Sequence, residues 1–97
     1  MTSQRVLNKI QVDALKREPC TDCGGTFPTD AMDFDHVRGV KIANISDLIS
    51  GPAEVILAEL TKVELVCATC HRIREMNRRL DRHVDAAELF DVELDDL

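Results

Sequence analysis

Two pairs of cysteines, each with the spacing Cys-x-x-Cys, constrain this chain more than any other feature of its sequence. The first pair is Cys20 and Cys23, the second is Cys67 and Cys70, and 43 residues lie between the pairs. Two glycines follow Cys23 and permit the tight turn that lets two sulfurs converge on one ion. Four thiolates are typical of a closed structural zinc site, and closing so long a loop stabilises the folded chain. The alternatives are four buried free thiols or a redox-active pair.

The length of the chain predicts one small domain. It has 97 residues, of which only three are aromatic, so the core must be aliphatic. A domain of this size is marginally stable unless something staples it, and the cysteines supply that staple. We expect a single domain over residues 1–84, with its motif-bearing core at 20–79, followed by an acidic C-terminal tail at 85–97.

The hydropathy pattern predicts a cytoplasmic protein. No apolar run approaches the length of a membrane span, and the first nine residues are polar rather than a signal peptide. Thiols stay reduced in the cytoplasm, which favours metal ligation over disulfide bonds. We expect no membrane partner.

Charge is distributed unevenly along the chain. The formal net charge is −6, which by itself argues against a nucleic-acid partner. However, six of the 18 acidic residues lie in the tail, so residues 1–84 carry 12 acidic and 12 basic side chains. Five arginines crowd the end of this part: Arg72, Arg74, Arg78, Arg79 and Arg82. Arg72, Arg74 or Arg78 could bind a phosphate, helped by the positive end of the helix dipole; the alternative is a solvated helix face paired with nearby acids.

Hydrophobic periodicity predicts an α+β fold. It indicates a helix over residues 4–18, capped by Ser3 or Thr2 and stopped by Pro19. The other expected elements are a strand at 31–37, a helical turn at 45–49, a helix at 53–62 beginning at Pro52, a strand at 63–66 and a helix from the second cysteine pair to about residue 84. The apolar residues expected to be buried are Val6, Leu7, Ile10, Ala14 and Leu15 in the first helix, and Ile73, Met76, Leu80 and Val84 in the last.

Asp35 and His36 form a second chemically informative pair. If a zinc ion joins the cysteine pairs, the strands that follow the first pair and precede the second lie side by side, and the last helix packs across them. His71, which follows Cys70, then lies near Asp35 and His36. Asp35 and His71 offer an oxygen and a nitrogen ligand to a divalent ion with open positions, and His36 remains as a base. The alternative is a structural or surface histidine.

Three segments carry a family resemblance: Cys20-x-x-Cys23-Gly, Asp33-Phe-Asp35-His36 and Leu65-Val-Cys67-Ala-Thr-Cys70-His71-Arg72. Together they resemble the zinc-stabilised HNH (His-Me finger) endonucleases, including phage recombination endonucleases of the endonuclease-seven type, over residues 20–79. The resemblance implies a ββα-metal core with flanking helices and a structural zinc on the four cysteines. It also implies hydrolysis of DNA phosphodiester bonds with a catalytic divalent metal such as Mg²⁺ or Mn²⁺, in a bacterial cell or a phage-infected host. His36 is then the general base, Asp35 and His71 are the catalytic metal ligands, and a monomer nicks one strand.

One position departs from the family pattern. The central asparagine of the family lies just before the second strand, where Glu64 stands here, and Asn44 is the other candidate for its role of orienting the base. The main alternative function is therefore a catalytically inactive zinc-binding module that binds DNA or a protein. A thiol redox protein is a third interpretation.

The expected partner is duplex or branched DNA. We expect contacts mainly with its backbone, because no aromatic residues interleave with the basic ones. A second copy of the chain, or a phage or host protein, is the other expected partner. The acidic tail either packs on the domain, docks on another protein or shields the arginines.

Overall fold

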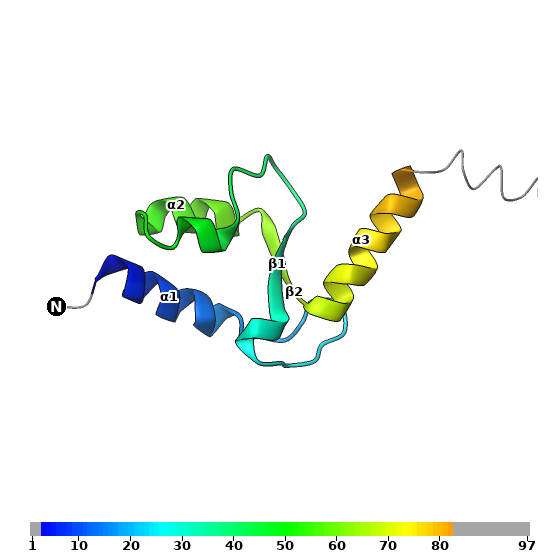
Figure 1. Cartoon of the computed structure of the whole chain (residues 1–97), viewed down its shortest axis with the longest axis horizontal. Helices are drawn as coiled ribbons and strands as arrows, with labels where there is room; N and C mark the ends of the chain where they lie inside the picture. The colour runs from blue at the N-terminus through cyan, green and yellow to red at the C-terminus, as the bar shows by residue number, and fades with distance from the viewer. Residues whose placement is uncertain (1–2, 83–97) are drawn as a thin grey trace, which may run out of the picture.

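A computed structural model describes residues 3–82 of the chain (Figure 1). Its elements in chain order are α1 (Gln4–Leu15), η1 (Thr29–Ala31), β1 (Met32–His36), η2 (Ile45–Leu48), α2 (Ala53–Leu60), β2 (Val63–Cys67) and α3 (Ala68–Arg82). The α+β class is confirmed, with three α-helices and a two-stranded sheet in the part that the structure describes. The predicted acidic tail lies outside the described residues.

The two strands form an antiparallel hairpin that separates the helices. Asp35 in β1 pairs with Glu64 in β2, and His36 pairs with Val63. Figure 1 shows α1 and α2 on one side of this hairpin and α3 on the other. Because successive side chains of a strand point to opposite faces, neighbouring residues of β1 meet different helices.

Among the described residues, the core consists of two small apolar clusters. The first joins α1, η2 and α2 through Val12, Ile45, Ile49 and Ile56, with Phe34 of β1 packed against it. Burial of each such side chain stabilises the fold by about 1.5–3 kcal/mol. The second cluster lies beside the cysteines and consists of Cys20, Met32, Val66 and Cys67.

A buried asparagine ties α1 to the segment before α2. The side-chain amide of Asn8 donates hydrogen bonds to the carbonyl oxygens of Ile49, at 2.8 Å, and Gly51, at 3.0 Å. Because unpaired buried amides are costly, these bonds fix where α1 lies.

The helix faces differ from the prediction. In α1 the buried residues are Asn8 and Val12, whereas Val6, Leu7 and Ile10 are 43–58% exposed. In α3 the expected apolar face is also exposed, with Ile73, Met76 and Leu80 at 47–63%. The reason in α3 is its polar stripe of His71, Arg74 and Arg78. Because Arg74 and Arg78 pair with buried Asp35, this stripe faces the sheet.

Two helix ends also differ from the prediction. Helix α1 ends at Leu15, before Pro19, because the N–H groups of Arg17 and Glu18 bond carbonyls three residues back in a tighter turn. Pro52 lies just outside α2 as its N-cap, with extended backbone (ψ 143°), rather than as its first helical residue.

Candidate metal sites

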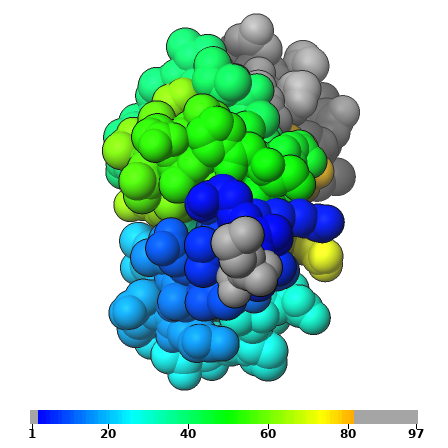
Figure 2. All heavy atoms as spheres, turned by 90° about the vertical axis from the view of Figure 1, so that its left-hand side faces the viewer, coloured from blue at the N-terminus to red at the C-terminus, as the bar shows by residue number. Residues whose placement is uncertain are grey.

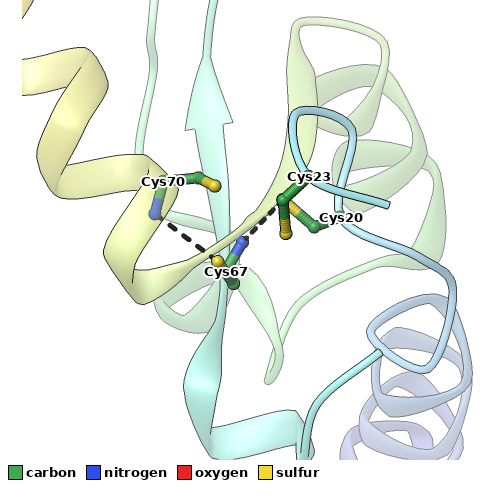
Figure 3. Close-up of side chains that lie close together, drawn as sticks. All are labelled: Cys20, Cys23, Cys67 and Cys70. Atoms are coloured by element: carbon green, nitrogen blue, oxygen red, sulfur yellow. Dashed lines mark hydrogen bonds between the residues drawn. The ribbon is translucent and has the colours of Figure 1, made fainter. Parts of the chain in front are cut away.

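Four cysteines that are far apart in the sequence meet in space. The four Sγ atoms lie within 4.8 Å of one another, and none is in a disulfide bond. They belong to Cys20, Cys23, Cys67 and Cys70. Cys20 and Cys23 come from the loop after α1, Cys67 ends β2 and Cys70 lies in the first turn of α3. Figure 3 shows their side chains gathered together. The predicted cluster is confirmed, and it could hold a metal ion such as zinc.

Backbone hydrogen bonds shape the cysteine cluster. The N–H of Gly24 donates to the carbonyl of Cys20 at 2.9 Å, and Gly24 has φ +73°, a conformation that favours glycine. The N–H of Cys67 donates to Sγ of Cys20 at 3.3 Å, and that of Cys70 donates to Sγ of Cys67 at 3.4 Å (Figure 3). Such N–H···S bonds stabilise negative charge on sulfur.

The thiol pKa values show why this cluster suits a cation. Burial opposes ionisation of Cys20, but backbone hydrogen bonds led by that of Cys23 lower the pKa of its thiol to about 6. The hydrogen bond with Cys67, together with burial, raises the pKa of Cys70 to about 12. The thiols of Cys20 and Cys70 are therefore both ionised only when a cation shares their charge. A divalent ion that prefers thiolates fits this donor set.

A second group of possible ligands lies between β1 and α3. Ligand atoms of Asp35, His71 and Glu75 lie within 4.8 Å of one another. Asp35 is buried in β1 at 4% exposure, and His71 and Glu75 are four residues apart, on one face of α3. The sequence prediction that Asp35 and His71 meet is confirmed. It missed Glu75, which the spacing of four residues from His71 could have indicated.

Asp33 sets the direction of the His71 ring. Nδ1 of His71 lies 3.0 Å from Oδ2 of Asp33, and its Nε2 lies 3.6 Å from Oδ1 of Asp35. A carboxylate bonded to one imidazole nitrogen is a common partner of metal-binding histidines, because it holds the other nitrogen ready for the ion. The sequence motif that contains Asp33 assigns no role to this residue.

Two arginines of α3 bind Asp35. Arg74 Nη1 lies 3.0 Å from Oδ2 of Asp35, and Arg78 Nη1 lies 2.9 Å from Oδ1. Burial raises the pKa of Asp35, but the hydrogen bonds from Arg78 and Arg74 outweigh it, and the net effect lowers that pKa. Asp35 is therefore a carboxylate in this structure.

Carboxylates engage two of the three arginines that are expected from the sequence to bind phosphate, Arg74 and Arg78. Arg74 also binds Asp22 through two nitrogens and lies 3.0 Å from Glu64. Arg78 is also paired with Glu75 at 2.6 Å, as the helix-face interpretation expected. Arg72, by contrast, is exposed.

His36 faces away from Asp35. Its Nε2 lies 2.9 Å from Oε2 of Glu59, which is buried in α2 at 2% exposure. Glu59 also accepts hydrogen bonds from Lys62 Nζ at 2.9 Å and from the N–H of Ile42 at 3.0 Å. The expectation that His36 would share a pocket with Asp35 and His71 is thus corrected, because adjacent residues of a strand point to opposite faces.

Glu59, rather than Glu64 or Asn44, is the residue whose side chain is hydrogen-bonded to His36. Glu64 pairs with Arg74, and the side chain of Asn44 donates to Asp47 at 3.2 Å. Neither is hydrogen-bonded to His36 in the described part of the chain. The hydrogen bond from Lys62 leads the causes that lower the pKa of Glu59 to about 2, so this side chain is ionised. An acid three residues after buried Ile56 was the available signal for it.

Surface depressions border the second ligand group on two sides. One, of about 280 Å³, is lined by Lys16, Asp33, Phe34, Asn44, Ile45, Ser46 and His71. Another, of about 290 Å³, is lined by Asp33, Ala68, His71, Arg72, Glu75 and Arg79. Asp33 and His71 belong to both, and Glu75 lines the second, so His71 and Glu75 border the open surface, whereas buried Asp35 lines neither depression.

Comparisons with known protein families, with curated proteins and with solved structures give no match. Among residues 3–82, no helix has both the length and the apolar character that crossing a bilayer requires.

Proposed function

We infer that the chain is a metal-dependent endonuclease of the HNH type, which hydrolyses DNA phosphodiester bonds. The observation that supports this most directly is the group of Asp35, His71 and Glu75 between a β-hairpin and the helix that follows it. In this proposal β1, β2 and α3 form the ββα-metal core. The cysteine cluster holds a structural zinc ion that fixes α3 against the hairpin, in a cytoplasm where thiols remain reduced.

Asp35 and His71 are the proposed ligands of the catalytic metal, with Glu75 beside them. An ion such as Mg²⁺ or Mn²⁺ would offset negative charge on the scissile phosphate and on the leaving oxygen. Asp33 holds His71 so that its Nε2 faces Asp35. Arg74 and Arg78 neutralise the Asp35 carboxylate in the metal-free protein, so they compete with the ion for its oxygens.

His36 is the proposed general base. Glu59 engages Nε2 of the ring on the α2 side of the strands, opposite to the ligand group at α3. The proposal therefore requires the scissile phosphate to lie at the end of β1, where Nδ1 of His36 takes a proton from the attacking water. His36 is the last residue of β1 and follows Asp35 directly. Arg72, exposed at the edge of the ligand group, binds the phosphate beside the scissile bond.

One observation favours a second function, a zinc-binding module that holds DNA or a protein without cutting it. Both oxygens of Asp35 already accept hydrogen bonds from arginines, which is a stable arrangement without a catalytic ion. In that case Arg74 and Arg78 are structural, and the zinc cluster alone organises the fold.

A plasmid-nicking assay with zinc analysis separates these functions. We expect one zinc ion per chain and conversion of supercoiled to nicked DNA on addition of Mg²⁺, Mn²⁺ or Ni²⁺. His36→Ala should keep the zinc and the circular dichroism spectrum but lose nicking by about 10²-fold or more. One zinc without nicking under any ion supports the binding module. No zinc, with reversible thiol oxidation, supports a redox protein.

The oligomeric state predicts the product. A monomer with one site cuts one strand, so linear plasmid should form only where a second copy or another partner supplies a second cut. Analytical ultracentrifugation beside the nicking assay tests this expectation.

A further inference from the structure

Three basic residues line one face of α1, far in the sequence from the arginines of α3. Arg5 and Lys9 lie in α1 and Lys16 is its C-cap; their spacing by four and then seven residues places them on the same side of the helix. Val12 lies on that side too, and it is buried in the core. The buried valine therefore fixes the direction in which the three cations project.

These cations border a groove between α1 and η2. The groove has a volume of about 200 Å³ and is lined by Arg5, Lys9, Val12, Lys16, Phe34, Ile45, Ser46 and Ile49. Figure 2 shows α1, in blue, across one face of the molecule next to α2, in green. Basic side chains thus surround a floor of apolar ones.

The groove is continuous with the candidate catalytic surface. It shares Lys16, Phe34, Ile45 and Ser46 with the depression that also contains Asp33 and His71. That depression in turn shares Asp33 and His71 with the one lined by Arg72 and Arg79. A line of depressions therefore runs from Arg5 on α1, past His71, to Arg79 on α3.

The cations of α1 remain available to a ligand. Lys9 is 60% exposed, and its ion pair with Asp13 contributes at most about 1 kcal/mol, as exposed pairs do. The ammonium of Lys16 lies 5.7 Å from the centre of the Phe34 ring, at the point where the groove meets the central depression. Cations spaced along a groove fit an extended polyanion better than a single phosphate.

We propose that Arg5, Lys9 and Lys16 bind the phosphate backbone of duplex DNA, which extends from α1 across His71 to Arg72 and Arg79. This assignment rests on the proposed function for its choice of polyanion. It makes the first helix part of the substrate-binding surface rather than a structural flank. The contacts are with backbone, so they add affinity and register without reading sequence.

Two double variants with the same change of charge test the proposal. Arg5→Gln/Lys9→Gln removes two cations from the groove, and Arg17→Gln/Lys41→Gln removes two exposed cations outside the three depressions. Affinity for a short DNA duplex is measured by fluorescence anisotropy at fixed salt without added catalytic ion. We expect the groove variant to bind roughly tenfold more weakly and to lose about two units of the salt dependence, and the control to change less than about twofold.

Further readouts keep the proposal separate from the nuclease function. Zinc content and circular dichroism should match the wild type in both variants, since the substituted side chains are exposed. The groove variant should still hydrolyse a small phosphodiester that does not reach α1. If the wild type nicks DNA but both double variants bind DNA as tightly as the wild type does, the groove assignment is wrong and the nuclease proposal stands. If no ion supports nicking but only the groove variant loses DNA affinity, the groove assignment stands and the nuclease proposal fails.

Equal losses of affinity in both double variants would also overturn the assignment, because they would show a general charge effect. Tighter binding of the wild-type protein to anionic lipid vesicles than to DNA would also overturn the assignment.

Discussion

The ring of His36 is hydrogen-bonded through Nε2 to Oε2 of Glu59, a carboxylate buried in α2 and 23 residues away in the sequence. This pair joins the end of β1 to a helix on the far side of the sheet from α3. Glu59 is itself held by Lys62 and by the backbone of Ile42. The direction of the His36 ring is therefore fixed by the fold.

Glu59→Gln should reduce nicking. The amide presents a donor as well as an acceptor to the imidazole and carries no charge, so it holds the ring less firmly than the carboxylate does. We expect a fall of about tenfold to 10²-fold in the nicking rate at saturating metal, with unchanged affinity for DNA. The matched control is Glu54→Gln, an exposed position on the same helix. Equal rates for the two variants would show that Glu59 has no part in orienting His36.

The same carboxylate predicts a pH dependence of stability. The pKa of Glu59 is lowered from 4.5 to about 2, with the hydrogen bond from Lys62 as the largest cause. A lowered folded-state pKa stabilises the fold above the unfolded value, and that contribution disappears as pH falls from 4.5 toward 2. The difference in unfolding free energy between the wild type and Glu59→Gln should therefore shrink over this range. A constant difference, in proteins with equal zinc content, would contradict the ionised pair.

Removal of one cysteine should cause both loss of the zinc ion and unfolding of the chain. In Cys23→Ser the hydroxyl replaces a thiolate, and the remaining ligands cannot close the site. We expect loss of bound zinc and of most helical circular dichroism signal. Thr69→Ser, between Cys67 and Cys70, is the control and should keep both. A folded, zinc-free Cys23→Ser protein would show that packing alone holds α3 against the hairpin.

Arg78→Gln should strengthen ion binding at Asp35. The variant removes a cation that now occupies the carboxylate, while Arg74 still neutralises it in the absence of metal. We expect the dissociation constant for Mn²⁺, followed by electron paramagnetic resonance, to fall by several-fold. Arg79→Gln removes the same charge from an exposed position and should change it much less. A weaker affinity in Arg78→Gln would mean that Arg78 supports the ion site rather than competing for it.

The cysteine cluster could be predicted from the spacing within each Cys-x-x-Cys pair. The approach of Asp35 to His71 could be predicted because His71 directly follows Cys70. Two Cys-x-x-Cys pairs can close on one ion in few ways, and the closure brings β1, β2 and the start of α3 together. The end of α1 could be predicted only approximately, since Arg17 and Glu18 continue the turn with hydrogen bonds to carbonyls three residues back instead of four.

The buried face of α3 could not be predicted from periodicity. The apolar stripe of Ile73, Met76 and Leu80 and the polar stripe that begins at His71 have similar helical spacing. The buried charge of Asp35 decides between them, and it comes from a distant strand. Glu59 was missed for the same reason, because its partner His36 is 23 residues earlier in the chain.

The central claim is that Asp35 and His71 hold an ion that is needed for cutting DNA. The most direct measurement is the nicking rate of supercoiled plasmid against Mn²⁺ concentration, for the wild type and for His71→Gln with equal zinc content. We expect saturable, Mn²⁺-dependent nicking by the wild type and a loss of about 10²-fold or more in the variant. Equal nicking by the two proteins, or no nicking by the wild type at any Mn²⁺ concentration, would contradict it.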